Sequence, residues 1–390
     1  MQLPLHGYRD FRWTGAWRVR LAPGAAARQK ALGPLQERVF QKWFKQLPPV
    51  APNAPPGAFA DDPDYDRGVR VAARTPRWSS WHSFPNASIG PRDGRIVTGG
   101  LMVPRTALVP GAEAFPRKKQ VKHWLKEMVW TRRRVDVALS LRNWHRSNFW
   151  HDFTDVAGRL VMAADHPELD GVPVLVSEAF AKSSLGTALI DSPLFAGREV
   201  IVQGERDIVR VDNLILLQTP LYDRGLIDRV AAVIPSGDWA QTPPRRIVLI
   251  RNAGNFSRRS CRGYDVLVAN LVARGFTAID PATLSIAAQK RLFETATHIV
   301  TENGAALTNM VFAPRGQLQL DVLVGVTAAT ETFQLLSYLY GHRMRTHLVD
   351  DHDLPDGRKE LILDRQTAAA ILDVCPRAAE KPGLTFQTTP

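Results

Sequence analysis

The sequence contains little cysteine and no long hydrophobic run. Its 390 residues include two cysteines, Cys261 and Cys375, which are too few for a disulfide framework and fit a reducing compartment. No stretch approaches the roughly 18 consecutive apolar residues of a membrane-spanning helix. The first residues lack the charged-then-apolar pattern of a secretion signal. We therefore expect a cytoplasmic protein.

Several familiar catalytic motifs are also missing. The chain has no Walker A loop, no strand-linked Gly-x-Gly-x-x-Gly, no Gly-x-Ser-x-Gly and no Cys/His spacing typical of zinc. Two acidic clusters have the composition of a metal-binding Asp-x-Asp: "DDPDYD" at 61–66, in a proline-rich loop, and "DDHD" at 350–353, after an expected strand. The second is the better metal candidate, although we expect no metal.

Acidic residues are fewer than basic ones, and the net charge is +12. This excess favours polyanionic partners such as nucleic acid, anionic lipid or phosphorylated small molecules, and a solvated basic surface explains it equally well. The basic residues concentrate in Arg117–Arg146, a tryptophan-containing stretch suited to peripheral contact with an anionic membrane. No nucleic-acid recognition motif accompanies them, so we expect no nucleic-acid partner and keep a basic nucleic-acid-binding protein as the weaker alternative.

Length and composition predict two domains. The apolar positions of residues 28–46 have helical spacing, and prolines then interrupt the chain. A second proline-rich break at 234–246 suggests an N-terminal domain over 1–240, a second domain over 241–345 and a C-terminal segment over 346–390.

Strand-like and helix-like segments alternate along the second half of the chain. This alternation indicates βαβ units and a parallel sheet, and hence an α/β fold. A helix is expected over 149–163. Strands are expected at 172–176, 199–202, 213–217, 246–251, 276–281, 297–301, 317–324 and 345–349, and further helices at 264–275, 285–296, 329–342 and 365–374.

Small residues gather in "TENGAALTN", where the expected strand at 297–301 ends. Ligands of open parallel sheets bind beyond the carboxyl ends of the strands, and a helix opening at Leu307 would offer N–H groups and its positive dipole end to phosphate. Gly304 permits a sharp turn, and Ala305 and Ala306 leave the backbone approachable. Tight packing of a helix on a sheet needs the same small residues, so both interpretations stay open.

An arginine-rich loop, "RNAGNFSRRSCRGYD", follows the expected strand at 246–251. Guanidinium groups match phosphate oxygens bidentately, which favours a diphosphate clamp; a solvated surface loop is the alternative. Its arginines are Arg251, Arg258, Arg259 and Arg262.

A histidine and an aspartate are spaced for contact in "NFWHDFTDV", residues 148–156. If the segment is helical, His151 and Asp155 lie one turn apart. The aspartate can then fix one imidazole tautomer and stabilise the protonated ring, which makes the histidine a usable base near pH 7. A structural histidine capped by an aspartate has the same spacing.

Together these three stretches resemble glycosyltransferase family 61, which includes plant xylan glycosyltransferases, animal protein O-linked N-acetylglucosaminyltransferases and bacterial capsular polysaccharide proteins. "NFWHDFTDV" resembles the family's Asn-x-Tyr-His-x-Phe-x-Asp, and "NGAALTNMVFAP" resembles its His-Gly-Ala-Gly-Leu-Thr-Asn block. The matching positions include Asn148, His151, Asp155, Gln289, Gly304, Ala305, Leu307, Thr308 and Asn309. The likeness covers about residues 148–322, and residues 1–140 match nothing.

The chain departs from the family pattern at three places. Asn303 stands where the family often has histidine, Ala306 replaces a glycine, and Tyr264-Asp265 replaces a common Asn-Glu pair. We expect these changes to affect sugar or nucleotide specificity more than the fold.

The resemblance implies a GT-B architecture, in which two Rossmann-like domains face a cleft and the C-terminal segment returns to the N-terminal domain. It implies inverting, metal-independent sugar transfer, with His151 as base and Asp155 as its orienting partner. The donor diphosphate and nucleotide would be held by the arginine loop, by residues 303–309 and by Asp321, which would bind the ribose; Glu302 is a weaker candidate.

The resemblance also implies the partners. We expect no cofactor beyond a nucleoside-diphosphate sugar, UDP-linked, as donor substrate. The acceptor would be a saccharide or lipid-linked saccharide in surface polysaccharide or glycoconjugate synthesis, reached at the inner membrane face. A GT-B-like module that binds nucleotide sugar without catalysis is the alternative.

Overall fold

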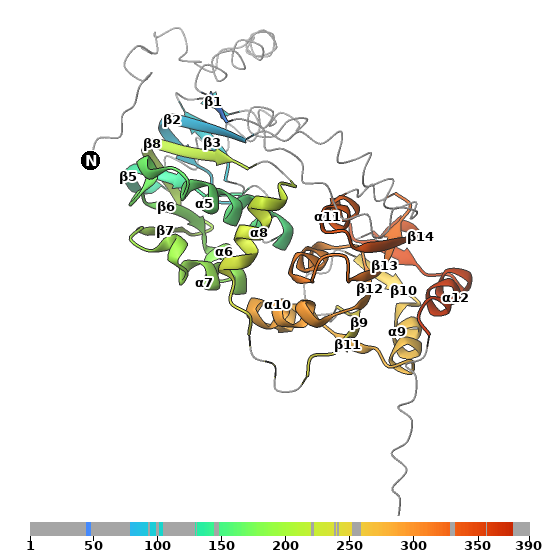
Figure 1. The fold of residues 1–390 in the computed structure, drawn as a ribbon. Helices are drawn as coiled ribbons and strands as arrows, with labels where there is room; N and C mark the ends of the chain where they lie inside the picture. The colour runs from blue at the N-terminus through green and yellow to red at the C-terminus, as the bar shows by residue number, and fades with distance from the viewer. Residues whose placement is uncertain are drawn as a thin grey trace, which may run out of the picture. The chain divides into compact units, whose positions relative to one another are not determined.

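The computed structural model describes residues 44–47, 79–92, 94–98, 101–103, 129, 131–143, 148–219, 222–237, 239, 242–251, 259–327, 332–355 and 357–376. They form two compact units, here called unit 1 (described residues up to 234) and unit 2 (described residues from 235) (Figure 1). Each unit is built on its own sheet, and the two are described separately.

The unit 1 sheet combines parallel and antiparallel strands. Among the described residues its order is β4-β3-β2-β8-β5-β6-β7, with β1 paired to β2. Strands β8, β5, β6 and β7 are parallel, and β1 to β4 join the sheet antiparallel. The strands are β1 Phe44–Leu47, β2 Ser79–Ile89, β3 Ile96–Thr98, β4 Leu101–Met102, β5 Thr131–Ser140, β6 Val174–Ser177, β7 Val200–Gln203 and β8 Ile208–Gln218.

Strand β6 of unit 1 is covered on both faces, because it buries Val174, Leu175 and Val176 in succession. The helical segments are α4 Phe149–His151, the π-helix η3 Asp152–Ala157, α5 Gly158–Ala163, α6 Glu178–Ala181, α7 Ser184–Ile190, α8 Arg224–Val233, and the 3₁₀ turns η4 Pro167–Leu169 and η5 Pro193–Phe195. The helix expected over 149–163 is confirmed, with a π-helical middle.

Residues 44–46 correct one expectation. They were expected at the end of a helix, but they form β1, which pairs with β2 from Ser79 to His82. Backbone pairing with an existing strand overrides helical spacing here. The rest of the expected helix, residues 28–43, lies outside the described residues.

Unit 2 is an α/β unit in which every sheet pairing is parallel except β14–β15. Its strands are β9 Arg246–Leu249, β10 Arg259–Arg262, β11 Thr277–Ile279, β12 His298–Glu302, β13 Gln319–Gly325, β14 Arg343–Asp353 and β15 Lys359–Ile362. Its helices are α9 Tyr264–Val272, α10 Ile286–Thr295, α11 Thr332–Tyr340, α12 Arg365–Asp373, and the 3₁₀ segments η6 Pro281–Thr283 and η7 Ala305–Phe312. The alternation expected from residue 246 onwards is confirmed.

The strand order places a topological switch point in unit 2. The order is β10-β15-β14-β13-β12-β9-β11. Its parallel part, β11-β9-β12-β13-β14, is the 2-1-3-4-5 order of a doubly wound sheet, whose ligands bind where the order reverses. That reversal lies between β9 and β12, so a ligand is expected beyond Leu249 and Glu302. Helices α9 and α12 share one core with the sheet, and η7 packs against α10 and α11 (Figure 1).

The described part of the C-terminal segment belongs to unit 2. Residues 346–390 were expected to leave the second domain, but through residue 376 they build its sheet. Strand β14 lies beside β13, β15 joins β14 to β10, and α12 contacts α9. The physical reason is the pairing of β14 with all seven residues of β13, a strand whose side chains are mostly buried. Residues 377–390 lie outside the described part of the chain.

Both sheets confirm the α/β class expected from the sequence. In the part of the chain that the structure describes, no helix has the length and apolar character needed to cross a membrane.

Candidate functional site

A histidine–aspartate pair lies in unit 1 immediately after the start of α4. His151 Nδ1 is 2.9 Å from Asp155 Oδ2, with the two side chains 22% and 13% exposed. A carboxylate can only accept, so the imidazole donates through Nδ1. Asn148 caps the helix by accepting from the backbone N–H of Trp150 at 3.1 Å, which fixes where the pair begins.

The pair is tied to the end of β5 by a further side chain. Asn143 Nδ2 donates to Asp155 Oδ2 at 3.4 Å, and Asn143 itself is 8% exposed. Asp155 lies within η3, a π-helical turn of the kind often found at functional sites. The π-turn therefore holds the carboxylate between His151 and the strand-end asparagine.

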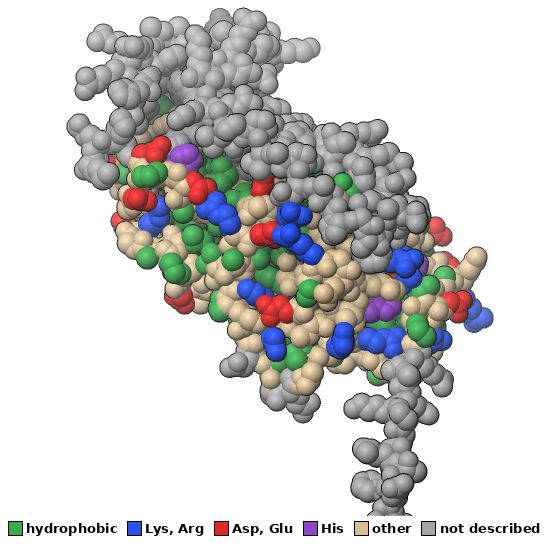
Figure 2. Space-filling model, viewed as in Figure 1, with side chains coloured by type: hydrophobic (Ala, Val, Ile, Leu, Met, Phe, Trp, Pro, Cys, Tyr) green, Lys and Arg blue, Asp and Glu red, His purple; other side chains and the backbone are tan. Residues whose placement is uncertain are grey.

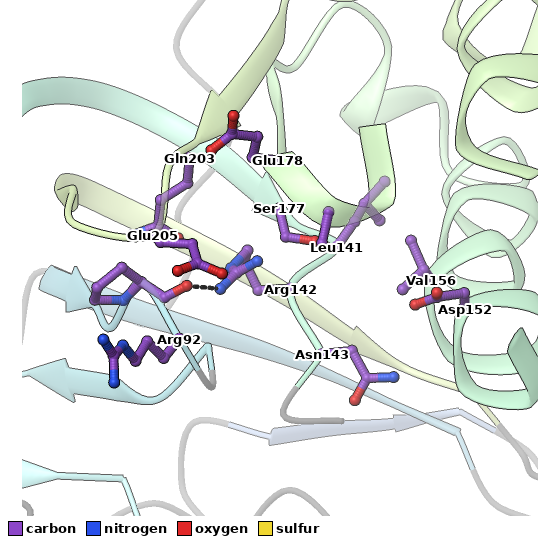
Figure 3. Close-up of a pocket in the computed structure, with 12 residues that line it drawn as sticks. Arg92, Leu141, Arg142, Asn143, Asp152, Val156, Ser177, Glu178, Gln203 and Glu205 are labelled. Carbon is purple, nitrogen blue, oxygen red and sulfur yellow. Dashed lines mark hydrogen bonds between the residues drawn. The ribbon is translucent and has the colours of Figure 1, made fainter. Parts of the chain in front are cut away.

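A pocket lies beside this pair, at the carboxyl ends of the parallel strands β5, β6 and β7. Its volume is about 550 Å³, including the open space at its mouth. Figure 3 shows Asp152 and Val156 entering it from the helix and Arg142 lying at its centre, with Arg142 donating to the carbonyl of Pro91. The lining residues are Pro91, Arg92, Leu141, Arg142, Asn143, Asp152, Val156, Ser177, Glu178, Ala179, Gln203 and Glu205.

Asp152 is the most perturbed acid of the pocket. Its pKa is raised to about 7, chiefly by burial and then by the charge of Asp155, while the charge of Arg142 lowers it. The residue is 7% exposed. A carboxyl group that titrates near neutral pH in a pocket indicates a functional position. The sequence did not single out Asp152, because its pKa depends on burial and on Arg142 rather than on any motif.

In unit 2, Arg251 and Gly304 meet at the switch point between β9 and β12. Arg251 Nη2 donates to the carbonyl of Asn303 at 3.3 Å, and Nη1 lies 3.7 Å from Glu302 Oε2. A side chain at position 304 would overlap this guanidinium. Glycine is therefore required for the close approach of Arg251, not for its backbone angles, which are extended.

The motif after Gly304 opens a helix that begins earlier, and is tighter, than expected. The expected segment was Leu307–Phe312; the structure has a 3₁₀ helix, η7, from Ala305. The side chains of Leu307, Thr308 and Asn309 are completely buried. Asn309 Nδ2 donates to Gln289 Oε1 of α10 at 2.8 Å and to the carbonyl of Ala306 at 3.1 Å.

The small-residue motif therefore packs a helix tightly, which is one of the two functions considered for it, and phosphate binding stays a prediction. Its second half packs η7 onto the unit, while Ala305 and Ala306, partly exposed, form the helix start beside Arg251. Gln289 has a structural partner in Asn309. Asn303 is 4% exposed, and its N–H continues the strand pairing by donating to Leu323 O at 2.8 Å.

Comparison with known proteins identifies the segment that carries both sites. Residues 149–319, less than half of the chain, match the family model described as Glycosyltransferase 61. Residues 149–319 are therefore similar to glycosyltransferase 61 proteins. The resemblance inferred from the three motifs is confirmed at family level, and a transferase of sugars is the activity that this family supports. No curated protein matches the chain.

The arginine cluster within the matched segment 149–319 is not a single loop. Arg259 and Arg262 lie in strand β10, which pairs with β15, and Arg262 donates to Glu360 at 2.5 Å. Residue 258 lies outside the described part of the chain. Of the four expected phosphate ligands, the structure places Arg251 at the switch point. The pairing of β10 with a strand a hundred residues later explains the difference.

Asp321 does not occupy a ribose-binding position. It lies two residues beyond the glycosyltransferase 61 match, is completely buried, and accepts from Arg345 Nε and Nη2 at 2.7 and 2.6 Å. His298 and His347 lie 2.7 and 2.8 Å from its oxygens. Burial by itself would raise the pKa of Asp321, but these hydrogen bonds and the charge of Arg345 hold it well below its usual range. The role expected for Asp321 is wrong because its partners come from β12 and β14, whose contacts the sequence does not show.

Part of the Asp321 cluster has side chains of the types that bind metal ions. Ligand atoms of His298, Asp321 and Cys375 lie within 4.8 Å of one another. Burial, and then the charge of Asp321, raises the pKa of the Cys375 thiol to about 12. A protonated thiol and a carboxylate already paired with Arg345 fit a structural network better than a metal centre.

The acidic stretch at 350–353 lies at the end of β14, where Asp351 makes hydrogen bonds within unit 2. Asp351 accepts from Thr327 N at 2.9 Å and from Lys359 Nζ at 3.2 Å. The cluster at 61–66 lies outside the described residues.

Most of the Arg117–Arg146 stretch also lies outside the described residues. Its described part is β5 and the residues that follow, in which Arg133 pairs with Glu199, Arg134 with Asp212, and Arg142 is buried. On the face shown in Figure 2, Lys and Arg side chains are interspersed with Asp and Glu.

Proposed function

We propose that this chain is an inverting glycosyltransferase that moves a sugar from a nucleoside-diphosphate sugar, UDP-linked, to a saccharide hydroxyl. The observation that carries the proposal is the His151–Asp155 hydrogen bond beside the unit 1 pocket, within the segment that matches glycosyltransferase 61. The switch point of unit 2, with Arg251 and the start of η7, supplies the donor side.

In this proposal His151 acts as general base through Nε2. As the acceptor oxygen attacks the anomeric carbon, its proton passes to His151, and the bond from that carbon to the diphosphate oxygen breaks. Attack from the face opposite the leaving group inverts the configuration. Asp155 holds the imidazole by its Nδ1–H and stabilises the imidazolium that forms.

The departing diphosphate gains negative charge, which a cation and free N–H groups stabilise. Arg251 is exposed and held by weak contacts, so its guanidinium can turn towards a phosphate. The first N–H groups of a helix have no partner within the helix, and Ala305 and Ala306 begin η7 beside Arg251. These groups together support metal-independent transfer.

Two further parts of the proposal concern arrangement and setting. The two units would face each other across a cleft as in GT-B enzymes, so that each substrate site lies at its own sheet edge. The enzyme would be cytoplasmic and would act on a lipid-linked saccharide at the inner membrane face, in surface polysaccharide synthesis. Failure of the purified chain to bind anionic liposomes at low salt would contradict this setting.

The donor half is tested by thermal unfolding with a panel of nucleoside diphosphates and nucleotide sugars, with and without EDTA. A ligand at about 100 times its Kd adds roughly 2.7 kcal/mol to the free energy of unfolding. A shift that persists in EDTA supports the metal-free site and names the donor. A shift that requires Mg²⁺ contradicts it.

The catalytic half is tested by replacing the base. His151→Ala should lower the transfer rate about 10²–10⁴-fold, the range for a general base, while donor binding is kept. His166→Ala is the matched control, because His166 also faces a carboxylate, Glu168 at 3.6 Å, but lies at the start of η4, outside the motif at 148–156. Donor binding without turnover in the wild type would instead indicate a non-catalytic nucleotide-sugar-binding module.

A further inference from the structure

The pocket of unit 1 contains a buried glutamine that has no role in the proposed base catalysis by His151. Gln203 ends β7 and is 1% exposed. Its Nε2 donates to the carbonyls of Ile89 and Asp207, both at 2.8 Å, so the amide is fixed in one orientation. The Oε1 atom of the same amide is buried and accepts no hydrogen bond from the described residues. A buried carbonyl oxygen in a pocket wall is stabilised by a donor, and a ligand hydroxyl is one.

The charges around the pocket are nearly balanced. Arg92 and Arg142 face Glu178, Glu205 and Asp152 across its walls. An excess of one sign would favour a phosphate or an amine, whereas mixed carboxyl, amide and guanidinium groups match hydroxyls, which both donate and accept. The pKa of Asp152, near 7, lets its carboxyl group do either at neutral pH. The pocket chemistry therefore suits a neutral polyhydroxylated ring.

The pocket is also linked to the base. Asn143 lines the pocket and donates to Asp155, which accepts from His151. The strand ends and the π-turn that carry these residues are fixed elements rather than long loops, as accurate positioning requires. A ring in this pocket is therefore coupled to the histidine through one shared asparagine.

We propose that this pocket binds one neutral sugar ring of the acceptor, with Asn143, Asp152 and Gln203 as its polar contacts. The inference rests on the proposed function, because it assigns the ring to the acceptor rather than to the donor. It adds the chemical class of the acceptor unit next to the reacting hydroxyl: an uncharged hexose or pentose residue.

The test is saturation-transfer NMR on the full chain without nucleotide, with methyl glycosides of glucose, galactose, xylose, rhamnose and N-acetylglucosamine, and with methyl glucuronide as the charged comparison. At least one neutral glycoside should bind, and methyl glucuronide should bind at least tenfold more weakly. Ala179→Trp fills the pocket mouth from an exposed position of α6 and should weaken neutral glycoside binding at least tenfold. Ala196→Trp, at an exposed alanine of unit 1 outside the pocket, should leave it unchanged.

Two outcomes overturn the inference: no neutral glycoside binds, or binding is the same in Ala179→Trp as in the wild type. The proposed function fails independently, through the absence of any nucleotide-sugar shift in thermal unfolding. Where transfer is measured, Ala179→Trp should raise the KM for acceptor at least tenfold and leave the KM for donor unchanged, and a raised donor KM would also overturn the inference.

Discussion

The two units each bury an aspartate near their parallel strands, and the two carboxyl groups behave oppositely. Asp321 of unit 2 is surrounded by Arg345, His298 and His347, and its pKa lies well below its usual range even though burial opposes this. Asp152 of unit 1 is almost as buried, and burial followed by the like charge of Asp155 raises its pKa to about 7, although the charge of Arg142 opposes this.

The opposite pKa shifts of Asp321 and Asp152 distinguish a structural carboxyl group from a functional one better than their burial does. A buried carboxylate with a full set of cationic and N–H partners stabilises the fold and has no capacity left for a ligand. A buried carboxyl group without that compensation costs folding free energy and remains available for proton exchange, as expected at a site. By this criterion the chemistry of unit 1 lies at η3, and the Asp321 cluster is part of the core of unit 2.

The largest expected change in the free energy of unfolding follows from replacing Asp321. Asp321→Asn leaves Arg345 without its counter-charge in a buried network and should lower the free energy of unfolding by about 3–5 kcal/mol at pH 7. The folded-state pKa of Asp321 is depressed, so its stabilisation is present above the unfolded value of 3.8 and is lost as the pH falls through lower values. The difference between wild type and variant should therefore shrink below about pH 4.

Urea unfolding, followed by hydrogen exchange in β12 to β14, measures this change. Asp350→Asn is the matched control, because Asp350 is an exposed aspartate of the same strand β14. Equal effects of the two variants would mean that the Asp321 network contributes little to the free energy of unfolding. Asp321 could then not be called a structural carboxylate in contrast to Asp152.

The next effect has the opposite sign. Asp152→Asn should stabilise the chain at pH 8, because it removes a carboxylate whose ionisation in the folded state is unfavourable. The folded-state pKa is raised from 3.8 to about 7. The destabilisation is therefore absent below pH 4, grows as the pH rises to about 7 and is constant above. At 1.36 kcal/mol per pKa unit the gain at pH 8 is on the order of 4 kcal/mol.

Thermal unfolding at pH 5, 6, 7 and 8 resolves this dependence. Asp191→Asn, at an exposed aspartate that ends α7, should show no such trend. A loss of stability in Asp152→Asn at every pH would show that the carboxylate has favourable partners, and Asp152 would then belong with Asp321.

The sequence predicted the local parts of this molecule well. Alternation of apolar segments predicted the strands and helices of unit 2, because each element has its own periodicity. The four-residue spacing of His151 and Asp155 predicted their contact, because it depends on a single helical turn. Asn309 was predicted to bind the donor, and in the structure its buried amide donates to Gln289.

The failures all involve partners distant in the sequence. Asp321 looked like a strand-end acid, and only the register of β12, β13 and β14 brings His298 and Arg345 to it. Arg262 looked like a phosphate ligand until β10 paired with β15. The unit 1 pocket was missed because its lining comes from separate strand ends and from a turn after β2. Its residues share no motif that a single sequence displays.

The smallest effect compares two arginines within unit 2. Arg345 is committed to Asp321, whereas Arg251 is exposed and contacts the carbonyl of Asn303 across the space that Gly304 leaves open. Gly304→Ala should displace the Arg251 guanidinium with little cost to folding, because the backbone angles at 304 suit any residue and the displaced atoms end a flexible side chain.

If Arg251 holds the donor diphosphate, the Kd for the nucleotide should rise about tenfold, the effect of one charged hydrogen bond. The substitution should add little in an Arg251→Ala background, because both changes remove the same contact. Titration of the nucleoside diphosphate into the two single variants and the double variant measures this coupling. Additive losses would show that Gly304 and Arg251 act separately, and unit 2 would then have no cation positioned for the leaving group at its switch point within the described residues.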